Sequence, residues 1–371
     1  MKRIVFFLPA LVGGGAERTI VNIANRINRE NYKVYLMVID TPTEGKYKDE
    51  YSQFVYKDVE VINLRIAITK RNYPRILRAI VKNVNRINPD IVMSTMLRPN
   101  ELLALASLFC HKSIKTVLRE SNNRVATEYS WIERKYIRFM YGKLAKRTIA
   151  LSKGVKRNMV ENFGINEKNI SVVYNPIDIQ NIEQQMEKKE LVLEGSGIKI
   201  INIGRLIPQK DQKCLIKAIG IVKKQIDCKL YILGKGELEG ELKTLVHSLQ
   251  LDENVEFMGF QSNPYEILAQ GDLFVLSSGW EGFGHVIVEA MVAGVPVVST
   301  NCDYGPGEII TDGYNGVLSP VGDEKELAEH ILEVVKDKEK MEQFSVRGKE
   351  RAQDFSIEKI VTQYETIFER L

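Results

Sequence analysis

Residues 273–300 read LFVLSSGWEGFGHVIVEAMVAGVPVVST and contain the pattern that decides the fold. Four apolar residues are followed by a loop of serines and glycines, by a helix-like run that opens near His285, and by a second apolar run, VPVVS. A short apolar strand, a glycine-containing loop, a helix and another apolar strand are typical of a βαβ unit in a parallel sheet. We therefore expect an α/β protein.

The same alternation extends over the whole chain in two series. The expected strands of the first series are 3–8, 34–39, 59–64, 91–94, 116–118, 148–150 and 171–173, and those of the second are 199–203, 229–233, 255–258, 273–276, 295–299 and 316–318. Two series of strands separated by helices predict two doubly wound domains, which suits a chain of 371 residues.

A polar, charged stretch divides the two series. It follows Asn175-Pro176, a turn signal, and ends in Gly195-Ser196-Gly197. We expect an N-terminal domain over 1–176, a linker over 177–197, a C-terminal domain over 198–355, and a final helix over 356–371 with Ser356 as its N-cap.

Charge differs sharply between the halves, although the net charge is only +4. Residues 1–180 hold 31 Lys and Arg against 16 Asp and Glu, whereas the remainder holds 21 against 32. A basic half suits nucleic acid, anionic lipid or a phosphorylated substrate. The ordinary apolar content excludes a disordered chain, and four cysteines without a CxxC pair indicate reduced thiols.

Three loops after expected strands carry the residues of chemical interest, because ligands of open α/β sheets bind at the carboxyl ends of strands. The first is Gly13-Gly14-Gly15, where backbone N–H groups could approach a phosphate or a sugar; a tight turn explains it equally well. The second holds Arg205 and Lys210, two cations that could grip a diphosphate, or simply two solvated charges.

The third loop precedes the helix that opens near His285 and carries two carboxylates eight residues apart. Glu281 lies in the loop and Glu289 about one turn into the helix, so both can face one ligand and accept hydrogen bonds from sugar or ribose hydroxyls. The alternative makes Glu281 a helix cap and exposes Glu289 to solvent, which the largely apolar helix disfavours.

Together these motifs resemble the retaining GT-B glycosyltransferases of family 4, especially bacterial members that build O-antigen, capsule or lipid-linked oligosaccharides. The resemblance covers essentially the whole chain and is most specific in its second half. It rests on Gly204-Arg205-Leu206 with Lys210, on Glu281-Gly282-Phe283-Gly284 with Glu289, on EAMVAGVPVVST and GPGEII, and on the early GGGAER loop.

The resemblance implies two Rossmann-like domains facing a central cleft, with the donor mainly on the second domain and the C-terminal helix crossing back to the first. It implies that Arg205 and Lys210 neutralise the donor diphosphate and that Glu281 contacts the donor sugar near the reacting carbon, as the catalytic residues. The implied donor-binding residues are Gly14, Gly15, Phe283, Gly284, His285 and Glu289. The family is typically metal-independent, so we expect no metal and no cofactor.

One segment departs from the family pattern. Many relatives carry a histidine after an N-domain strand, where this chain has Arg119-Glu120. Arg119 or Glu120 is expected to replace that contact with donor or acceptor.

The implied activity is retaining transfer of a hexose or N-acetylhexosamine from a nucleotide sugar, expected to be UDP-linked. The implied acceptor is a saccharide carried on a polyprenyl diphosphate. Because no second carboxylate is identifiable as a nucleophile, front-face attack by the acceptor hydroxyl is favoured. Two alternatives are a sugar-nucleotide epimerase with the same fold and a non-catalytic module that binds nucleic acid through the basic half.

Two basic segments of the first half mix cations with apolar residues at helical spacing, the pattern of a helix on a membrane surface. One spans 69–82 and holds Arg71, Arg75, Arg78 and Lys82; the other spans 134–147. Ordinary amphipathic helices with solvated outer faces explain them nearly as well. No apolar run is long enough to span a bilayer, so we expect a cytoplasmic enzyme attached peripherally to the inner face of the cytoplasmic membrane.

Overall fold

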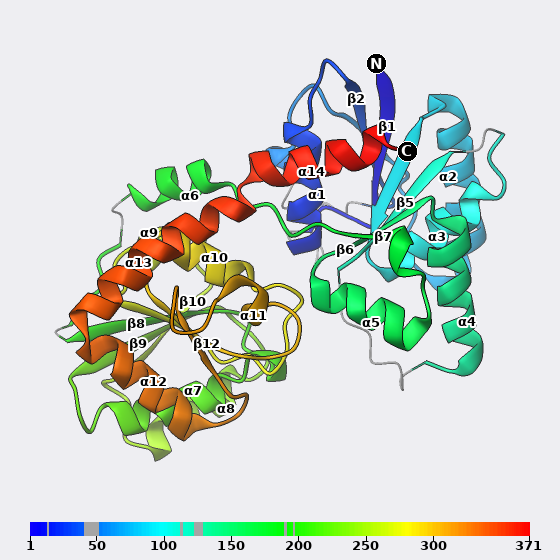
Figure 1. Ribbon diagram of the computed structural model, residues 1–371. Coiled ribbons are helices and arrows are strands. Elements are labelled where there is room, and N and C mark those ends of the chain that lie inside the picture. Colours follow the sequence, from blue (N-terminus) through cyan, green and yellow to red (C-terminus); the bar gives the residue numbers. More distant parts are fainter. Residues whose placement is uncertain (13–14, 41–51, 112–113, 122–128, 189–190, 196) are drawn as a thin grey trace. The chain divides into compact units, whose positions relative to one another are not determined.

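The computed structural model describes residues 1–12, 15–40, 52–111, 114–121, 129–188, 191–195 and 197–371. Their contacts divide the chain into two compact units (Figure 1). Unit 1 is Met1–Pro176 with Ile357–Leu371, and unit 2 is Ile177–Ser356. Each unit is a parallel sheet flanked by helices, which confirms the expected α/β class with two Rossmann-like domains.

Unit 1 contains a seven-stranded sheet in the order β3-β2-β1-β4-β5-β6-β7. The strands are β1 (Lys2–Leu8), β2 (Tyr32–Val38), β3 (Glu60–Asn63), β4 (Ile91–Thr95), β5 (Lys115–Glu120), β6 (Arg147–Ala150) and β7 (Ile170–Val172). The helices are α1 (Gly15–Arg26), α2 (Tyr73–Ile87), α3 (Leu97–Ser107), α4 (Trp131–Phe139), α5 (Lys153–Phe163) and α14 (Ile357–Glu369).

Both faces of this sheet are buried, which is why β1 is apolar at every position from Ile4 to Leu8. Val5 and Phe7 point into a core shared with α2 and α3, whereas Ile4 and Phe6 point into a second core. That second core is closed by α1 and by α14.

The C-terminal helix α14 packs on unit 1, as the resemblance implied. Ile360, Tyr364 and Phe368 recur every four residues and are fully buried. The Phe368 ring lies 6.5 Å from Phe6 and 6.3 Å from Tyr32, centroid to centroid. Residues distant in sequence therefore complete the core of unit 1.

Unit 2 contains a six-stranded sheet in the order β10-β9-β8-β11-β12-β13. The strands are β8 (Ile198–Ile203), β9 (Cys228–Leu233), β10 (Val255–Gly259), β11 (Leu273–Leu276), β12 (Val297–Thr300) and β13 (Val317–Ser319). The helices are α6 (Ile179–Met186), α7 (Gln212–Val222), α8 (Glu239–Ser248), α9 (Tyr265–Leu268), α10 (His285–Val292), α11 (Pro306–Ile309), α12 (Glu324–Lys336) and α13 (Lys338–Ala352).

The stretch 177–197, expected to be a linker, instead contributes helix α6 to unit 2. The Asp178 side chain caps this helix by accepting a hydrogen bond from the Asn181 backbone N–H at 3.1 Å. Ile179 and Ile182 are buried where α6 contacts α9 and α10. Polar composition concealed the helix because only these two positions form its apolar face.

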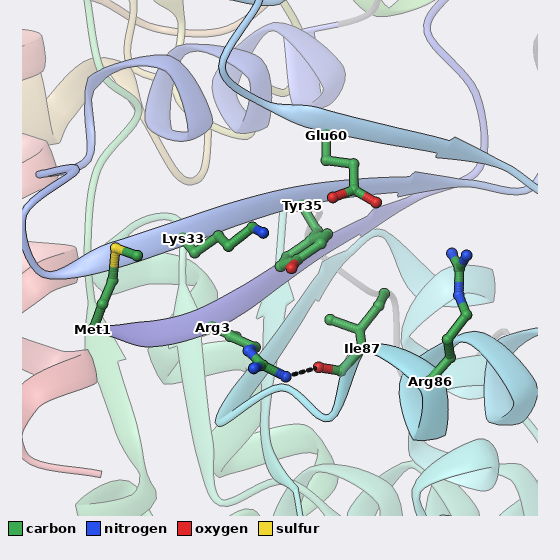
Figure 2. Close-up of a pocket in the computed structure, with 7 residues that line it drawn as sticks. All are labelled: Met1, Arg3, Lys33, Tyr35, Glu60, Arg86 and Ile87. Carbon is green, nitrogen blue, oxygen red and sulfur yellow. Dashed lines mark hydrogen bonds between the residues drawn. The ribbon is translucent and has the colours of Figure 1, made fainter.

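A hollow of about 420 Å³ lies at the amino ends of β1, β2 and β3 (Figure 2). Arg3, Lys33 and Arg86 line it, but the Arg3 guanidinium donates a hydrogen bond to the Ile87 carbonyl at 2.7 Å and so caps α2. The hollow lies at the strand ends opposite the carboxyl edge, where α/β sheets bind ligands. The candidate site lies instead at the carboxyl edge of the other sheet, in unit 2.

Candidate active site

The point where the strand order of unit 2 reverses lies between the neighbouring strands β8 and β11. The loop after β8 carries Arg205 and ends in a 3₁₀ turn, Pro208–Lys210. The loop after β11 carries Glu281 and leads into α10. Both loops leave the carboxyl edge of the sheet at this reversal, which is where doubly wound sheets bind ligands.

Hydrogen bonds join the two loops. The Gly279 N–H donates to the Gln209 carbonyl at 2.8 Å, and the Gln209 side-chain amide donates to the Trp280 carbonyl at 2.8 Å. The Ser277 hydroxyl donates to the Lys210 carbonyl at 2.9 Å. The loops therefore hold each other, and the side chains that they carry are positioned together.

Lys210 and Glu281 form an ion pair between Nζ and Oε1. The same carboxylate oxygen accepts a hydrogen bond from the Ser278 hydroxyl at 2.7 Å. The side chains are only 16% and 8% exposed, so their electrostatic interaction is screened less than that of a surface pair. Together with burial, the charge of Glu281 raises the pKa of the nearby Cys302 thiol to about 12.

Arg205 lies exposed at the carboxyl end of β8. Among the residues that the structure describes, its guanidinium has no hydrogen-bond or ion-pair partner, and only its backbone carbonyl is bound, by the Gln212 side chain. Its five N–H donors are thus available to a ligand, whereas Lys210 is held.

Glu289 points away from solvent, so the alternative in which it is a surface carboxylate is wrong. It lies in α10, is 4% exposed, and accepts a hydrogen bond from the Tyr265 hydroxyl at 3.4 Å. A carboxylate buried behind the β11 loop is suited to accept hydrogen bonds from a neutral polar ligand.

The residues Phe283, Gly284 and His285 form the start of α10. Gly284 is the N-cap residue with φ of 93°, a conformation that side chains rarely adopt. The Phe283 ring is buried against Phe355 and His285, with centroids 5.3 Å and 5.6 Å away. The Phe283 side chain therefore anchors the loop that leads into α10.

In unit 1, the described residues include only the last glycine of the glycine loop. Gly14 lies outside the described residues, and Gly15 is the exposed first residue of α1. Glu17, two residues into the helix, is 6% exposed, and this burial raises its pKa above the usual value.

Arg119 has a structural position that contradicts the expectation of a donor or acceptor contact. It is fully buried at the end of β5, and its guanidinium donates to the Tyr364 hydroxyl at 3.0 Å, to the Thr95 hydroxyl at 3.1 Å and to the Asn175 side-chain oxygen. These bonds tie α14 to the sheet, so the cation holds unit 1 together. Spacing alone could not show that its partners lie 24, 56 and 245 residues away.

Glu120 is also buried and occupied. Its Oε2 accepts a hydrogen bond from the Tyr141 hydroxyl at 2.6 Å, and its Oε1 accepts one from the Ser121 N–H at 3.1 Å. It lies at the carboxyl edge of the sheet of unit 1, and its carboxylate is already bonded to protein groups there. This geometry does not support the expectation that Glu120 contacts the donor or the acceptor.

Sequence reasoning missed the residues that support Glu281. Ser278 lies three residues before it, and this short spacing was the available signal. Two further glycines, Gly234 and Gly236, lie in the loop that follows β9. A Cβ atom on Gly236 would lie 2.1 Å from the Leu206 carbonyl oxygen, so this glycine lets the β9 loop pack against the β8 loop.

The membrane-facing candidates Arg71, Arg75, Arg78 and Lys82 are all exposed. The last three lie on α2, opposite its buried residues Ile76, Ile80 and Val84. Across the ranges described, none of the helices is both long and apolar enough to cross a membrane. Within those same ranges, no three His, Cys, Asp or Glu side chains form a group that could hold a metal ion.

Two doubly wound units, each built on a parallel sheet, are the architecture of the GT-B fold. HepE from Anabaena, solved in complex with UDP, shares this fold with a TM-score of 0.85 at 23% identity, covering 100% of both chains.

The family follows from two sequence models. Residues 13–181 match the model described as Glycosyltransferase Family 4, and residues 183–351 match that described as Glycosyl transferases group 1. The chain therefore belongs to the family 4 glycosyltransferases with the GT-B fold.

Two curated relatives are similar over most of their length. One is the Campylobacter jejuni N-acetylgalactosamine-N,N'-diacetylbacillosaminyl-diphospho-undecaprenol 4-alpha-N-acetylgalactosaminyltransferase, 27% identical over 97% of both chains. The other is the lipopolysaccharide 1,6-galactosyltransferase of Escherichia coli K12, 26% identical over 86% of both chains.

Proposed function

We propose that this glycosyltransferase moves a hexose or an N-acetylhexosamine from a UDP-sugar to a saccharide acceptor on a polyprenyl diphosphate, with retention of anomeric configuration. The proposal rests on the two loops at the strand-order reversal of unit 2. Lys210 and Glu281 form an ion pair there, and the Arg205 guanidinium, in the same loop as Lys210, has no partner among the described residues. UDP in HepE and the undecaprenol-diphospho acceptor in the name of the Campylobacter relative support donor and acceptor.

The reaction separates charge, and the two cations are placed to meet it. Breaking the anomeric bond leaves negative charge on the departing diphosphate. Lys210 is fixed before the ligand arrives, because Glu281 binds its ammonium group and its alkyl stem lies against Gly204. A positioned charge needs little rearrangement during reaction, and removing one such group commonly costs about 10²–10³-fold in rate. Arg205 adds a planar fork that suits a phosphate.

Glu281 has two tasks in this proposal. Its Oε1 atom holds Lys210 and Ser278, and its carboxylate accepts hydrogen bonds from the hydroxyls of the donor sugar. The acceptor hydroxyl then attacks from the face that the diphosphate leaves, and its proton passes to the departing phosphate oxygen. Glu289 and the backbone amides at Phe283, Gly284 and His285 hold the nucleotide.

The first unit is the part proposed to meet the membrane. It holds 33 Lys and Arg against 18 Asp and Glu, a net charge of +15, whereas unit 2 holds 19 against 30. We propose that the enzyme attaches peripherally to the anionic inner face of the cytoplasmic membrane through unit 1, with Arg71, Arg75, Arg78 and Lys82 on the attached surface.

A donor-hydrolysis screen across nucleotide sugars tests the proposed activity. One sugar, expected to be UDP-linked, should be hydrolysed to UDP and free sugar, and Arg205→Ala or Lys210→Ala should lower the rate about 10²-fold or more. Lys213→Ala is the matched control, because Lys213 is exposed in α7 and pairs with Glu241. Conversion of the nucleotide sugar to an isomer without UDP release would instead indicate an epimerase.

The same assay tests the proposal that neither metal nor cofactor takes part. Treatment with a chelator should leave hydrolysis and transfer unchanged. Loss of turnover that is restored by a divalent cation would contradict it.

A further inference from the structure

Helix α4 of unit 1 exposes an unusual set of large apolar side chains. Trp131 is 66% exposed, Ile132 60% and Phe139 48%, and Ile137 is the helix residue that is buried. At 3.6 residues per turn, Trp131, Lys135 and Phe139, with Ile132 beside them, lie on the side of α4 opposite Ile137. We call this set the α4 face.

The α4 face is held rigidly by its neighbours. Ser130 and Glu133 form a capping box that fixes the start of the helix. On its flank, the Arg134 guanidinium donates to the Asn162 carbonyl at 3.1 Å, and the Arg138 guanidinium covers Gly164 at the end of α5. Arg134 thus binds a carbonyl at the end of α5, a favourable place for a cation, and α4 packs beside α5 (Figure 1).

Cations outnumber carboxylates in and beside the α4 face. The Lys135 ammonium lies 4.8 Å from the centroid of the Trp131 ring, and a hollow of about 340 Å³ beside it is lined by Arg134 and Arg138 with one carboxylate, Glu161. The one acidic residue of α4, Glu133, is bound in the capping box. A helix that presents tryptophan, isoleucine and phenylalanine among lysine and arginine matches the interface of a bilayer that carries negative charge.

Helix α2 lies in the other basic segment that the sequence predicted for the membrane surface, and it differs in this respect. It exposes Arg75, Arg78 and Lys82, but none of its described large apolar side chains is exposed. Its cations can attract an anionic surface, yet its residues expose no large apolar side chain that could insert into a bilayer. The two helices therefore have different tasks.

We infer that the α4 face is the element that inserts into the headgroup region of an anionic bilayer, whereas the basic side of α2 contributes attraction only. This inference rests on the proposed membrane attachment and not on the proposed transfer chemistry. The occupant of the α4 face is thus a lipid surface, and a protein partner is an outcome that the experiment must separate.

The 371 residues of this chain include two tryptophans, Trp131 and Trp280, which makes a direct test possible. In a Trp280→Phe protein, all tryptophan emission comes from Trp131. With vesicles of equal parts phosphatidylglycerol and phosphatidylcholine, this emission should shift to shorter wavelength and be quenched by lipids brominated along their acyl chains. Binding to these vesicles without any change in Trp131 emission would overturn the inference.

A variant pair gives the second readout. Trp131→Ala combined with Phe139→Ala should weaken vesicle binding by about tenfold or more, even at salt concentrations that screen charge. The matched control is Leu108→Ala combined with Phe109→Ala, which removes two apolar residues that are 56% and 68% exposed at the end of α3. Thermal melting should be unchanged in both, because the truncated side chains lie outside the core.

The outcomes separate the proposals. If both double variants lose vesicle binding equally, or neither loses any, the inference that α4 inserts into the bilayer is overturned, whereas membrane attachment itself is not. Absence of binding to any vesicle would overturn attachment and this inference together and favour a protein partner for the face. Donor hydrolysis, which needs no membrane, tests the transfer chemistry separately.

Discussion

At the residue scale, the candidate site shows how one carboxylate can be both structural and chemical. Glu281 is expected to face the donor sugar, and it also neutralises the nearly buried ammonium of Lys210. Removing it leaves a buried cation without its counter-charge, so Glu281→Ala should lower stability as well as activity. Glu289 is bonded to the uncharged hydroxyl of Tyr265, so replacing its charge leaves no buried cation unpaired there. Its effect on ligand binding can therefore be measured with less effect on stability.

Glu289→Gln should weaken UDP binding while keeping the shape of the side chain. A hydrogen bond to a charged group contributes about 1.5–3 kcal/mol, which corresponds to roughly tenfold to over a hundredfold in affinity. Calorimetric titration with UDP measures it, with Glu237→Gln, an exposed residue of the β9–α8 loop, as control. Unchanged affinity in Glu289→Gln would mean that this carboxylate faces no ribose.

Three buried thiols of unit 2 should make its stability fall in alkaline solution. Burial raises the pKa of Cys214 and Cys302 to about 12 and that of Cys228 to about 11, from 9.0. Below pH 9 the thiols stay protonated in both the folded and the unfolded chain. Above pH 9 the unfolded chain releases the thiol protons, whereas the folded chain keeps them up to its higher pKa values. Stability should therefore fall between pH 9 and 12, by at most about 1.4 kcal/mol per pH unit and thiol.

Urea unfolding at a series of pH values checks this. Cys302→Ala removes one titrating thiol and should make the decline between pH 9 and 12 shallower, whatever its effect at neutral pH. The half-buried Cys110 belongs to unit 1, so Cys110→Ala should leave the decline of unit 2 unaltered. If the unfolding free energy of Cys302→Ala falls with pH as steeply as that of the unchanged protein, thiol ionisation does not cause the decline.

At the element scale, α14 and the Arg119 cluster explain why a basic residue can be wholly buried in unit 1. Arg119 binds the hydroxyls of Tyr364 and Thr95 and the amide oxygen of Asn175, and none of these groups carries a charge. Burial of a cation is tolerated when its N–H groups are bonded. The helix α14 is therefore attached to the sheet by polar bonds as well as by its apolar face.

Tyr364→Phe should destabilise unit 1 without changing its shape. The substitution removes the oxygen that accepts the Arg119 Nε–H and leaves a buried charged donor unsatisfied, which costs about 1.5–3 kcal/mol. Urea unfolding followed by circular dichroism measures the loss. Tyr314→Phe is the control, because Tyr314 is 51% exposed, and an equally small effect of both variants would show that the Arg119–Tyr364 bond contributes little.

At the scale of the whole molecule, the two units carry opposite net charges. A net charge of +15 on unit 1 is obscured by −11 on unit 2, so the overall value of +4 understates the attraction that unit 1 can exert. Attraction of this kind acts over about a Debye length and weakens as salt shortens that length from about 10 Å to 3 Å.

Co-sedimentation with anionic vesicles should consequently fall steeply with salt. Replacing Arg71, Arg75, Arg78 and Lys82 by glutamate should lower binding further at low salt, since each Lys or Arg near an anionic surface contributes about 1 kcal/mol. Charge reversal of four exposed lysines of unit 2, namely Lys213, Lys243, Lys325 and Lys338, is the control. Equal binding to neutral vesicles would contradict an electrostatic attachment.

The sequence by itself determined the strands, the helices between them other than α6, and the loops that carry the candidate site residues. Those features depend on local patterns. Leu273–Leu276 is an apolar run, and the neighbouring residues are enough to place Glu281 in a loop and Glu289 in a helix. Arg205, Lys210 and Glu281 were singled out because strand ends in doubly wound sheets bind ligands.

Only the tertiary structure decided which of these residues meet. Lys210 and Glu281 are 71 residues apart and pair because β8 and β11 are neighbours, a consequence of strand order that spacing does not encode. The resemblance predicts a ligand contact for Arg119 because many relatives carry a histidine in this segment. Its partner Tyr364 lies 245 residues away, on a helix that returns to the first sheet. The apolar side of α4 likewise became visible only when the core had selected Ile137 and left Trp131, Ile132 and Phe139 outside.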